Sequence, residues 1–331
     1  MKAVFYERKG PAREVLQLGE RPVPRPAAGE VRVRVYVSAV NPSDTKQRGG
    51  HRGNVTMPFP AVIPHQDGAG VIDAVGEGVD PARVGQRVWV YEATLGRPFG
   101  TCAEFTTVPA HKAVPLPDRA DFEAGACMGI PAMTAHRCVM ADGPVAGQTV
   151  LVHGGAGAVG FYAVQIAKIA GAMVIATVSR EEQARRAREA GADHVLNYRE
   201  DDLVRRVREI TGTDWGVDRA VDVAFGANLA TNMELLRPGA TIATYASDAV
   251  PDPQIPFWPM LARDLTVRFV LVYAMPRAAH DEAAAFITEA LAAGRFVHQV
   301  QGRYPMERCD EAHEATESMR NVGKVLVSIA Q

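Results

Sequence analysis

The first ~120 residues, rich in valine, proline and glycine, contain a run with the period-two alternation of apolar and polar positions that is typical of half-buried strands. This run is VRVRVYVSAV at residues 31–40, and shorter valine-rich runs follow between glycine turns. Prolines at positions 22, 24, 26, 58, 60 and 64 exclude long helices between them. We predict an irregular all-β unit here.

From Asp121 onward the pattern changes to apolar strands that alternate with amphipathic helices. Asp121 is a candidate N-cap of a helix that Gly143 and Pro144 end. The alternation predicts an α/β fold, a doubly wound parallel sheet covered on both faces as in dinucleotide-binding proteins. We expect its six strands at residues 149–154, 172–179, 194–198, 219–225, 241–246 and 265–273.

In the C-terminal segment the strand–helix alternation stops. Helices are predicted at 280–294 and 306–320, followed by a closing strand at 324–330. A closing strand so far from the β-rich half can rejoin it and make the first domain discontinuous. The predicted division is residues 1–122 with 275–331 as one domain, and residues 123–274 as the cofactor-binding domain.

Composition narrows the class of protein. The 331 residues are 47% hydrophobic, and 36 basic residues nearly balance 38 acidic ones. This excludes disorder and gives no broad attraction to nucleic acid or anionic membranes. The four cysteines form no CxxC pair, and the N-terminal residues lack an apolar stretch. We therefore expect a soluble, cytoplasmic enzyme.

The strongest chemical signal is a GxGxxG turn between a buried strand and a helix. Such a turn has three requirements: a sharp change of direction, close approach of a diphosphate to backbone N–H groups, and close packing of the helix. Each requirement excludes a Cβ atom, which explains a glycine at each place. The helix N-terminus then offers unpaired donors to the diphosphate. The alternative is a glycine-rich turn without a ligand. The predicted cofactor-binding residues are Gly155, Ala156, Gly157, Ala158, Val159 and Gly160.

The end of the next strand indicates which dinucleotide is bound. An NAD site usually has an acidic residue about 20 positions on, where this chain has Ser179 and Arg180. A hydroxyl and a guanidinium suit a ribose 2′-phosphate, which a carboxylate would repel. We predict NADPH. In the alternative interpretation Arg180 only opens a solvated helix, and Glu181 or Glu182 contacts the ribose.

The GxGxxG turn lies in mid-chain, after a proline-rich β domain. In this arrangement the chain resembles the medium-chain dehydrogenase/reductase superfamily. The closest resemblance is to its zinc-free quinone oxidoreductase and zeta-crystallin branch. The segments that carry it run nearly end to end in family order. They are SAVNPSDTKQRGG (38–50), IPHQDGAGVIDAVGEGV (63–79), CAEFTTVP (102–109), GIPAMTAH (129–136), LVHGGAGAVG (151–160), GADHVLNYRE (191–200), LLRPGATI (235–242) and GKVLV (323–327).

The resemblance implies a GroES-like β domain closed by the C-terminal segment, with a Rossmann domain between its two parts. It places Asn41 and Asp44 by the nicotinamide, and Thr134 on the nicotinamide side. It also places Tyr198 by the 2′-phosphate and Lys324 at the tail-side closure of the cofactor site. Each position is assigned because it matches the motif of the branch.

Lys46 is a departure from the branch, which commonly has tyrosine at this position. Lys46, like Arg48, could add positive charge near the acceptor, or both could be loop residues in water. We include Lys46 with Asn41 and Asp44 as candidate catalytic residues.

No metal is predicted. In zinc-dependent relatives the first catalytic ligand, a cysteine, would fall at Asn41 and another near Pro131. His65 could imitate the histidine ligand, but Gln66 and Asp67 follow it where a His-Glu pair is expected. One imidazole does not hold a catalytic zinc ion. We interpret His65 as a polar cleft residue or a satisfied structural histidine.

These features predict direct hydride transfer from NADPH to a quinone or α,β-unsaturated carbonyl, small acceptors that delocalise the incoming charge. The alternatives are an enone or alkenal reductase, a non-catalytic, crystallin-like NADPH-binding protein, and a zinc-dependent alcohol dehydrogenase. The strand at 265–273 is expected to be the sixth and an edge strand. An apolar edge is a liability unless paired, which predicts a homodimer through it.

Overall fold

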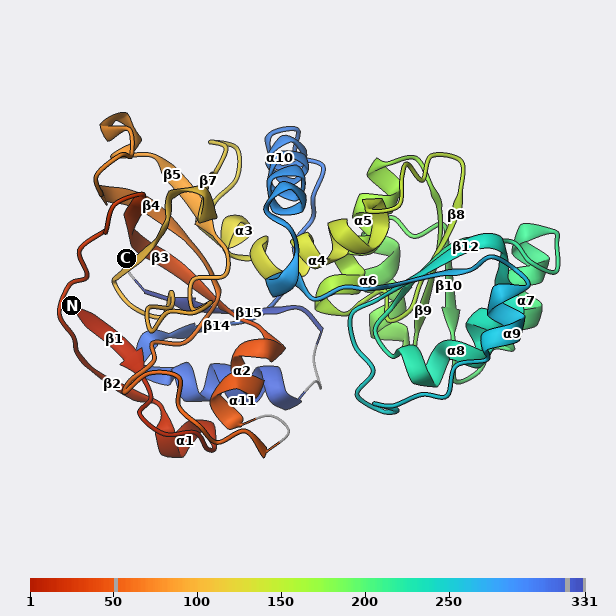
Figure 1. Ribbon diagram of the computed structural model, residues 1–331, viewed down its shortest axis with the longest axis horizontal. Coiled ribbons are helices and arrows are strands. Elements are labelled where there is room, and N and C mark those ends of the chain that lie inside the picture. The colour runs from red at the N-terminus through yellow and green to blue at the C-terminus, as the bar shows by residue number, and fades with distance from the viewer. Residues whose placement is uncertain (51–52, 319–321, 330–331) are drawn as a thin grey trace. The chain divides into compact units, whose positions relative to one another are not determined.

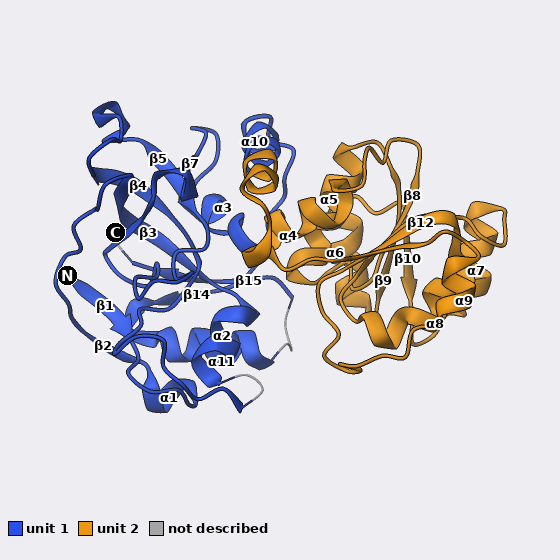
Figure 2. Ribbon diagram, in the orientation of Figure 1, with its two compact units in different colours: residues 1–130, 284–331 blue, residues 131–283 orange. Residues whose placement is uncertain are grey.

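The computed structural model describes residues 1–50, 53–318 and 322–329. Its backbone forms two compact units: residues 1–130 with 284–331 are unit 1, and residues 131–283 are unit 2 (Figures 1 and 2). The predicted borders at 122/123 and 274/275 lie earlier along the chain than these. One reason is α3 (Phe122–Ala126), which packs on the strands of unit 1 and so belongs with them.

Unit 2, all of whose residues are described, contains a six-stranded parallel sheet in the order β10-β9-β8-β11-β12-β13. Numbered within the unit this is 3-2-1-4-5-6, the order of dinucleotide-binding domains. The predicted doubly wound sheet and its edge strand β13 are thus confirmed. The strands are β8 (Thr149–Val152), β9 (Met173–Val178), β10 (His194–Asn197), β11 (Val217–Asp222), β12 (Leu236–Thr244) and β13 (Thr266–Phe269).

Helices cover both faces of this sheet, α5 and α6 on one and α7 and α8 on the other (Figure 1). Apolar side chains of α7 recur at helical spacing and pack on the core beside β11 and β12. Asp202 caps this helix, and left-handed Gly212 ends it. The helices are α5 (Ala158–Ile169), α6 (Glu181–Glu189), α7 (Leu203–Thr211), α8 (Phe225–Leu235) and α9 (Phe257–Leu261).

Two predicted helices have different bounds in the structure. The helix expected at 229–239 ends at Leu235, because Pro238 disfavours helical backbone at the residue before it, and β12 already begins at Leu236. The helix expected from Asp121 is divided into α3 and α4 (Gly129–Met140). Asp121 caps α3 as predicted, accepting a hydrogen bond from the Ala124 N–H.

Among the described residues of unit 1, seven strands form a mixed sheet in the order β14-β15-β3-β4-β5-β7, with β6 on β3. The closing strand β15 pairs antiparallel with β3, so the tail rejoins the β-rich half as expected. β1 and β2 form a separate pair. The strands are β1 (Lys2–Phe5), β2 (Gln17–Glu20), β3 (Glu30–Val40), β4 (Asp67–Val75), β5 (Arg87–Val90), β6 (Phe105–Pro109), β7 (Ala113–Pro115), β14 (Val300–Pro305) and β15 (Lys324–Ser328).

Both predicted tail helices are present in the structure. Met319, Arg320 and Ala330, at the ends of predicted tail elements, lie outside the described residues. β3 confirms the alternation of the N-terminal pattern, since Val31, Val33 and Val35 are all buried. The helices are α1 (Ala12–Val15), α2 (Pro42–Gly49), α10 (Arg277–Ala292), which crosses the border between units, and α11 (Cys309–Ser318).

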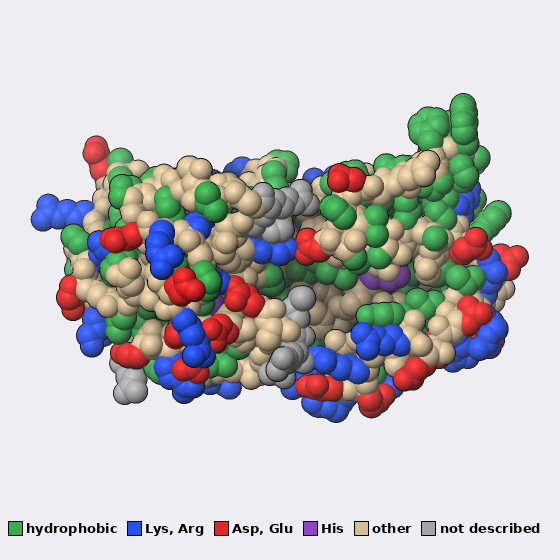
Figure 3. Space-filling model, turned by 90° about the horizontal axis from the view of Figure 1, so that it is seen from below, with side chains coloured by type: hydrophobic (Ala, Val, Ile, Leu, Met, Phe, Trp, Pro, Cys, Tyr) green, Lys and Arg blue, Asp and Glu red, His purple; other side chains and the backbone are tan. Residues whose placement is uncertain are grey.

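The surface agrees with the near-zero net charge. On the face drawn in Figure 3, acidic and basic side chains are interspersed, without a broad field of one sign. Within the described part of the chain, no helix has the length and apolar character needed to cross a membrane.

Candidate active site

The glycine turn lies where β8 gives way to α5, at the carboxyl end of the parallel strand. Left-handed backbone occurs at Gly154, with φ +67°, one residue before the predicted motif. A Cβ at Gly155 would come within 2.7 Å of the Ala176 Cβ, and one at Gly160 within 2.2 Å of the Gly154 carbonyl oxygen. The turn therefore packs tightly against β9 and against itself.

The N-terminus of α5 is open toward a ligand. Gly157, the N-cap, supplies no side-chain cap and is exposed. The N–H groups of the first turn, those of Ala158, Val159 and Gly160, are therefore available to an anion. Ala156, the second residue of the motif, is buried. This arrangement fits a diphosphate.

A buried polar network holds the turn from below. His153 Nε2 lies 2.8 Å from Asn232 Oδ1, and the Asn232 amide donates to Asp222 Oδ2 at 2.8 Å. Asp222 ends β11 and also accepts the Ala224 N–H at 2.7 Å, while Thr177 on β9 accepts the Gly154 N–H at 3.3 Å. The network joins the carboxyl ends of three neighbouring strands, which rigidifies the edge where ligands bind in such sheets.

At the end of β9 the structure places the two residues predicted to select the dinucleotide. Ser179 is half-buried, and its N–H and hydroxyl both donate to Gln183 Oε1 at 2.9 Å. Arg180 is the N-cap of α6, and Tyr198, which follows β10, is 50% exposed. Thr134 lies on α4 and is 5% exposed. Glu181, the alternative ribose ligand, forms an ion pair with Arg188 at 2.8 Å.

A second cluster, inside unit 1, surrounds Asn41. The side-chain amide of Asn41 donates to Asp67 Oδ2 at 2.8 Å, and the side-chain oxygen of Asn41 accepts from the Lys324 ammonium. Lys324 also forms an ion pair with Asp67 at 3.1 Å, and the Ile130 N–H donates to the same carboxylate. Burial raises the pKa of Asp67, and Lys324 opposes this shift. Asp67 was not among the predicted site residues.

Asp44 has a structural role in this neighbourhood. Its carboxylate accepts the Asn41 N–H at 2.7 Å, which is its part of a capping box at the start of α2. It also accepts the Gln66 N–H at 3.1 Å. Burial is the main cause that raises the pKa of Asp44 to about 6. Both oxygens are thus used to hold the backbone that presents Asn41.

The two basic residues of α2 differ in their surroundings. Lys46 is half-buried in the last turn. Arg48 is 1% exposed, and it donates to the Gly10 carbonyl and forms an ion pair with Glu317. The interpretation of Arg48 as a loop residue in water is wrong, because its charge is neutralised inside unit 1.

His65 is fully buried, so the interpretation as a polar cleft residue is wrong. Its Nδ1 lies 2.8 Å from Ser38 Oγ and its Nε2 lies 2.9 Å from His313 Nε2. Cys309, one helical turn before His313 on α11, adds a thiol to the same cluster. The spacing of Cys309 and His313, four residues apart, is the one sequence signal that could have indicated this group.

Comparison with known proteins now identifies the chain. Residues 27–118 match the family model of the alcohol dehydrogenase GroES-like domain, and residues 158–289 match that of the zinc-binding dehydrogenase. Human quinone oxidoreductase is 31% identical over 95% of this chain and 93% of its own length. The chain is a member of the quinone oxidoreductase family. Its superfamily is that of the medium-chain dehydrogenases/reductases, as the sequence motifs indicated.

Two further relatives support the assignment to the quinone oxidoreductase family. The 2-haloacrylate reductase of a Burkholderia species is 31% identical over 99% of this chain and 98% of its own length. The structure of Escherichia coli quinone oxidoreductase complexed with NADPH has a TM-score of 0.84 at 28% identity, covering 99% of this chain and all of that one.

One matched family model carries zinc in its name, but the side chains at the predicted catalytic position do not offer the ligands that a zinc ion requires. In this chain Asn41 stands where the cysteine ligand is expected. The Lys324 ammonium already lies against the Asn41 oxygen and the Asp67 carboxylate. A divalent cation at the same oxygens would be repelled by that ammonium, so these residues do not fit a catalytic zinc ion.

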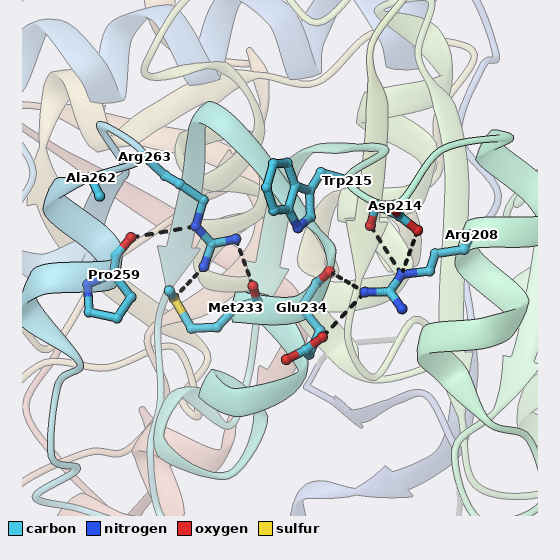
Figure 4. Close-up of a pocket in the computed structure, with 8 residues that line it drawn as sticks. All are labelled: Arg208, Asp214, Trp215, Met233, Glu234, Pro259, Ala262 and Arg263. Atoms are coloured by element: carbon cyan, nitrogen blue, oxygen red, sulfur yellow. Dashed lines mark hydrogen bonds and ion pairs between the residues drawn. The ribbon is translucent and has the colours of Figure 1, made fainter.

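A pocket of about 520 Å³ in unit 2 is not the cofactor site (Figure 4). It lies where the chain enters β11, β12 and β13, at the amino ends of these strands, whereas ligands of parallel sheets bind at the carboxyl ends. Arg263 donates to the Met233 carbonyl at 2.7 Å, and Arg208 pairs with Glu234 at 3.2 Å. The guanidinium groups of Arg208 and Arg263 in this pocket thus hold α8 to the segments beside it.

Proposed function

We propose that this chain reduces quinones and other α,β-unsaturated carbonyl compounds with NADPH. The observation that carries the proposal is the uncapped glycine turn after β8, followed at the end of β9 by Ser179 and Arg180 instead of a carboxylate. The named activities of the human and Burkholderia relatives and the NADPH complex of the Escherichia coli enzyme support it.

In this proposal the first turn of α5 binds the diphosphate through the N–H groups of Ala158, Val159 and Gly160. Arg180 binds the ribose 2′-phosphate, and the exposed ring of Tyr198 lies beside it. The Ser179 hydroxyl, which donates to Gln183 in the structure, turns to donate to the phosphate instead. Thr134 contacts the nicotinamide. Lys324 acts through Asn41, since its ammonium lies on the Asn41 oxygen rather than in solvent.

NADPH, when bound, supplies the hydride. The role assigned to Asn41 is to donate a hydrogen bond to the acceptor oxygen as it gains negative charge. Its amide nitrogen carries two protons, and one of them is used by Asp67. Asp67 and Lys324 fix the plane of the amide from both ends, so the remaining N–H is held in one direction. The proton that completes the reduction comes from solvent.

The direct test is oxidation of NADPH by 1,4-benzoquinone, 9,10-phenanthrenequinone and a simple enone, followed by absorbance. We expect turnover with at least one of these acceptors and a clear preference for NADPH over NADH. A protein that binds NADPH but oxidises it with none of them would support the non-catalytic alternative instead.

Arg180→Gln tests the selection of the dinucleotide. Hydrogen bonds to charged groups contribute about 1.5–3 kcal/mol, so kcat/KM for NADPH should fall about 10- to 100-fold while that for NADH changes little. Arg185→Gln, which removes a charge paired with Glu189 on the same helix, is the matched control and should behave as wild type. Equal losses with both coenzymes would contradict the assignment of Arg180.

We also propose a homodimer through β13. This strand ends the order of the unit 2 sheet, and no described strand pairs with its outer edge. Phe269 at its end is 70% exposed, and Leu271 just beyond is 61% exposed. Apolar side chains beside an unpaired edge favour continuation of the sheet into a second copy.

Leu271→Lys should convert the dimer to a monomer at micromolar concentration, because it places a charge beside the proposed continuous sheet. Light scattering gives the mass of wild type and variant. Val84→Lys, at a site 51% exposed in unit 1, is the control and should remain dimeric. A monomeric wild type would disprove the proposal.

A further inference from the structure

A chain of hydrogen bonds fixes which nitrogen of His65 carries its proton. The Thr101 hydroxyl donates to the Asp67 carbonyl at 2.6 Å, since a carbonyl only accepts. The Ser38 hydroxyl, 2.7 Å from Thr101 Oγ1, must therefore donate to it. Ser38 Oγ then accepts from His65 Nδ1 at 2.8 Å. His65 thus carries a proton on Nδ1, which leaves Nε2 as the nitrogen that can present a lone pair to a ligand.

That lone pair faces two other ligand-type atoms. His313 Nε2 lies 2.9 Å from His65 Nε2, and Cys309 Sγ lies 3.8 Å from it. The ligand atoms of all three residues lie within 4.8 Å of one another. Cys309 and His313 are four residues apart on α11, so they share one face of the helix. A histidine that donates from one nitrogen while the other faces such a group is typical of metal sites.

The distances are close to those of a tetrahedral zinc site. Zinc–nitrogen bonds of about 2.05 Å and zinc–sulfur bonds of about 2.3 Å place two nitrogens about 3.4 Å apart and a nitrogen and sulfur about 3.6 Å apart. The two observed separations differ from these by a few tenths of an ångström. Small rotations of the His313 and Cys309 side chains therefore suffice to admit the ion.

A second thiol completes the set. Cys102 Sγ lies 3.5 Å from Cys309 Sγ, close to the ~3.8 Å between two thiolates on one zinc ion. To take the fourth position, the Cys102 side chain must turn toward the two imidazoles, because its sulfur is outside the group of three mutually close ligand atoms. Two thiolates neutralise a divalent cation, which matters because Cys102, Cys309, His65 and His313 are each at most 2% exposed.

The backbone at His65 is independent support for a constrained site. His65 has φ +81°, in the left-handed region that favours glycine. A buried residue other than glycine keeps such a conformation only where its surroundings fix it. Here the conformation aims the ring between Ser38 and α11.

We propose that His65, His313, Cys309 and Cys102 bind one zinc ion that fastens α11 to the β-rich unit. Binding releases the two thiol protons to solvent and involves no change of oxidation state. The site is structural and is independent of the proposed reductase activity. Of the residues aligned with the catalytic zinc ligands of relatives, it uses only His65.

Metal analysis of protein purified without chelators or metal-affinity resin tests the proposal. We expect about one zinc ion per chain in wild type and less than ~0.1 in Cys309→Ser. Cys138→Ser, which removes a buried free cysteine of unit 2, is the control and should keep its zinc. Equal zinc in wild type and Cys309→Ser would overturn the proposal.

A measurement on wild type alone covers the case in which the variant does not fold. Co²⁺ added to chelator-treated protein should give a thiolate-to-cobalt charge-transfer band that zinc abolishes, with a dissociation constant below ~1 μM. 1,10-Phenanthroline should lower the Tm. Absence of any band together with no zinc in the purified protein, or a Cys102–Cys309 disulfide under anaerobic conditions, would overturn the assignment.

Discussion

Lys324→Met should lower the free energy of unfolding by about 3–5 kcal/mol at pH 7.5, because it leaves a fully buried carboxylate without its cation. Asp67 is 0% exposed, and Lys324, at 5%, is the ammonium that pairs with it. Methionine preserves most of the volume of the side chain, so the loss reports the charge rather than a cavity. Urea denaturation measures it.

The effect should depend on pH with a definite sign. The pKa of Asp67 in the folded protein is raised above its ordinary value of 3.8 by burial, and removing Lys324 raises it further. The folded variant then binds a proton that the unfolded chain has released, so its stability falls as pH rises through this window. The difference between variant and wild type should therefore be smaller at pH 5 than at pH 7.5.

The double variant Lys324→Met with Asp67→Asn is the control for this interpretation. Removing both charges should restore part of the lost stability, although the new amide offers the Ile130 N–H a single acceptor oxygen in place of two. If the double variant is less stable than Lys324→Met alone, the buried charge is not the cause of the loss.

The fold of unit 2 could be predicted because its signals are local and periodic. Strands such as 149–152 are short apolar runs, and the intervening helices show apolar positions at helical spacing. The glycine turn was found by its spacing. However, the left-handed residue of the turn is Gly154, which the motif omits, while Gly155 is required for packing against Ala176.

The polar cluster of unit 1 could not be predicted in the same way. Lys324 and Asp67 are separated by 257 residues, and His65 and His313 by 248. Such pairs leave no periodic pattern, since one hydrogen bond needs only two residues of suitable type brought together by the fold. The motif comparison indicated Asn41 and Lys324 separately, but not that one holds the other.

The glycine turn gives the second large expected effect. Gly160→Ala should weaken NADPH binding at least ~30-fold and lower the free energy of unfolding by about 1–3 kcal/mol. The new Cβ would lie 2.2 Å from the Gly154 carbonyl oxygen and 3.1 Å from the Gly155 Cα. Both are backbone atoms, so the turn itself must move and the N–H groups of α5 move with it.

Two other glycines separate binding from folding. At Gly157 a Cβ would meet only the Gly154 carbonyl oxygen, at 3.3 Å, so the fold should tolerate alanine while the diphosphate is kept from the exposed backbone. Gly157→Ala should therefore lose affinity at nearly unchanged stability. Gly49→Ala, where nothing lies within 4 Å, should lose neither. Calorimetry with NADPH and urea denaturation of the three variants measure both quantities. Wild-type affinity in Gly157→Ala would mean that the diphosphate binds elsewhere.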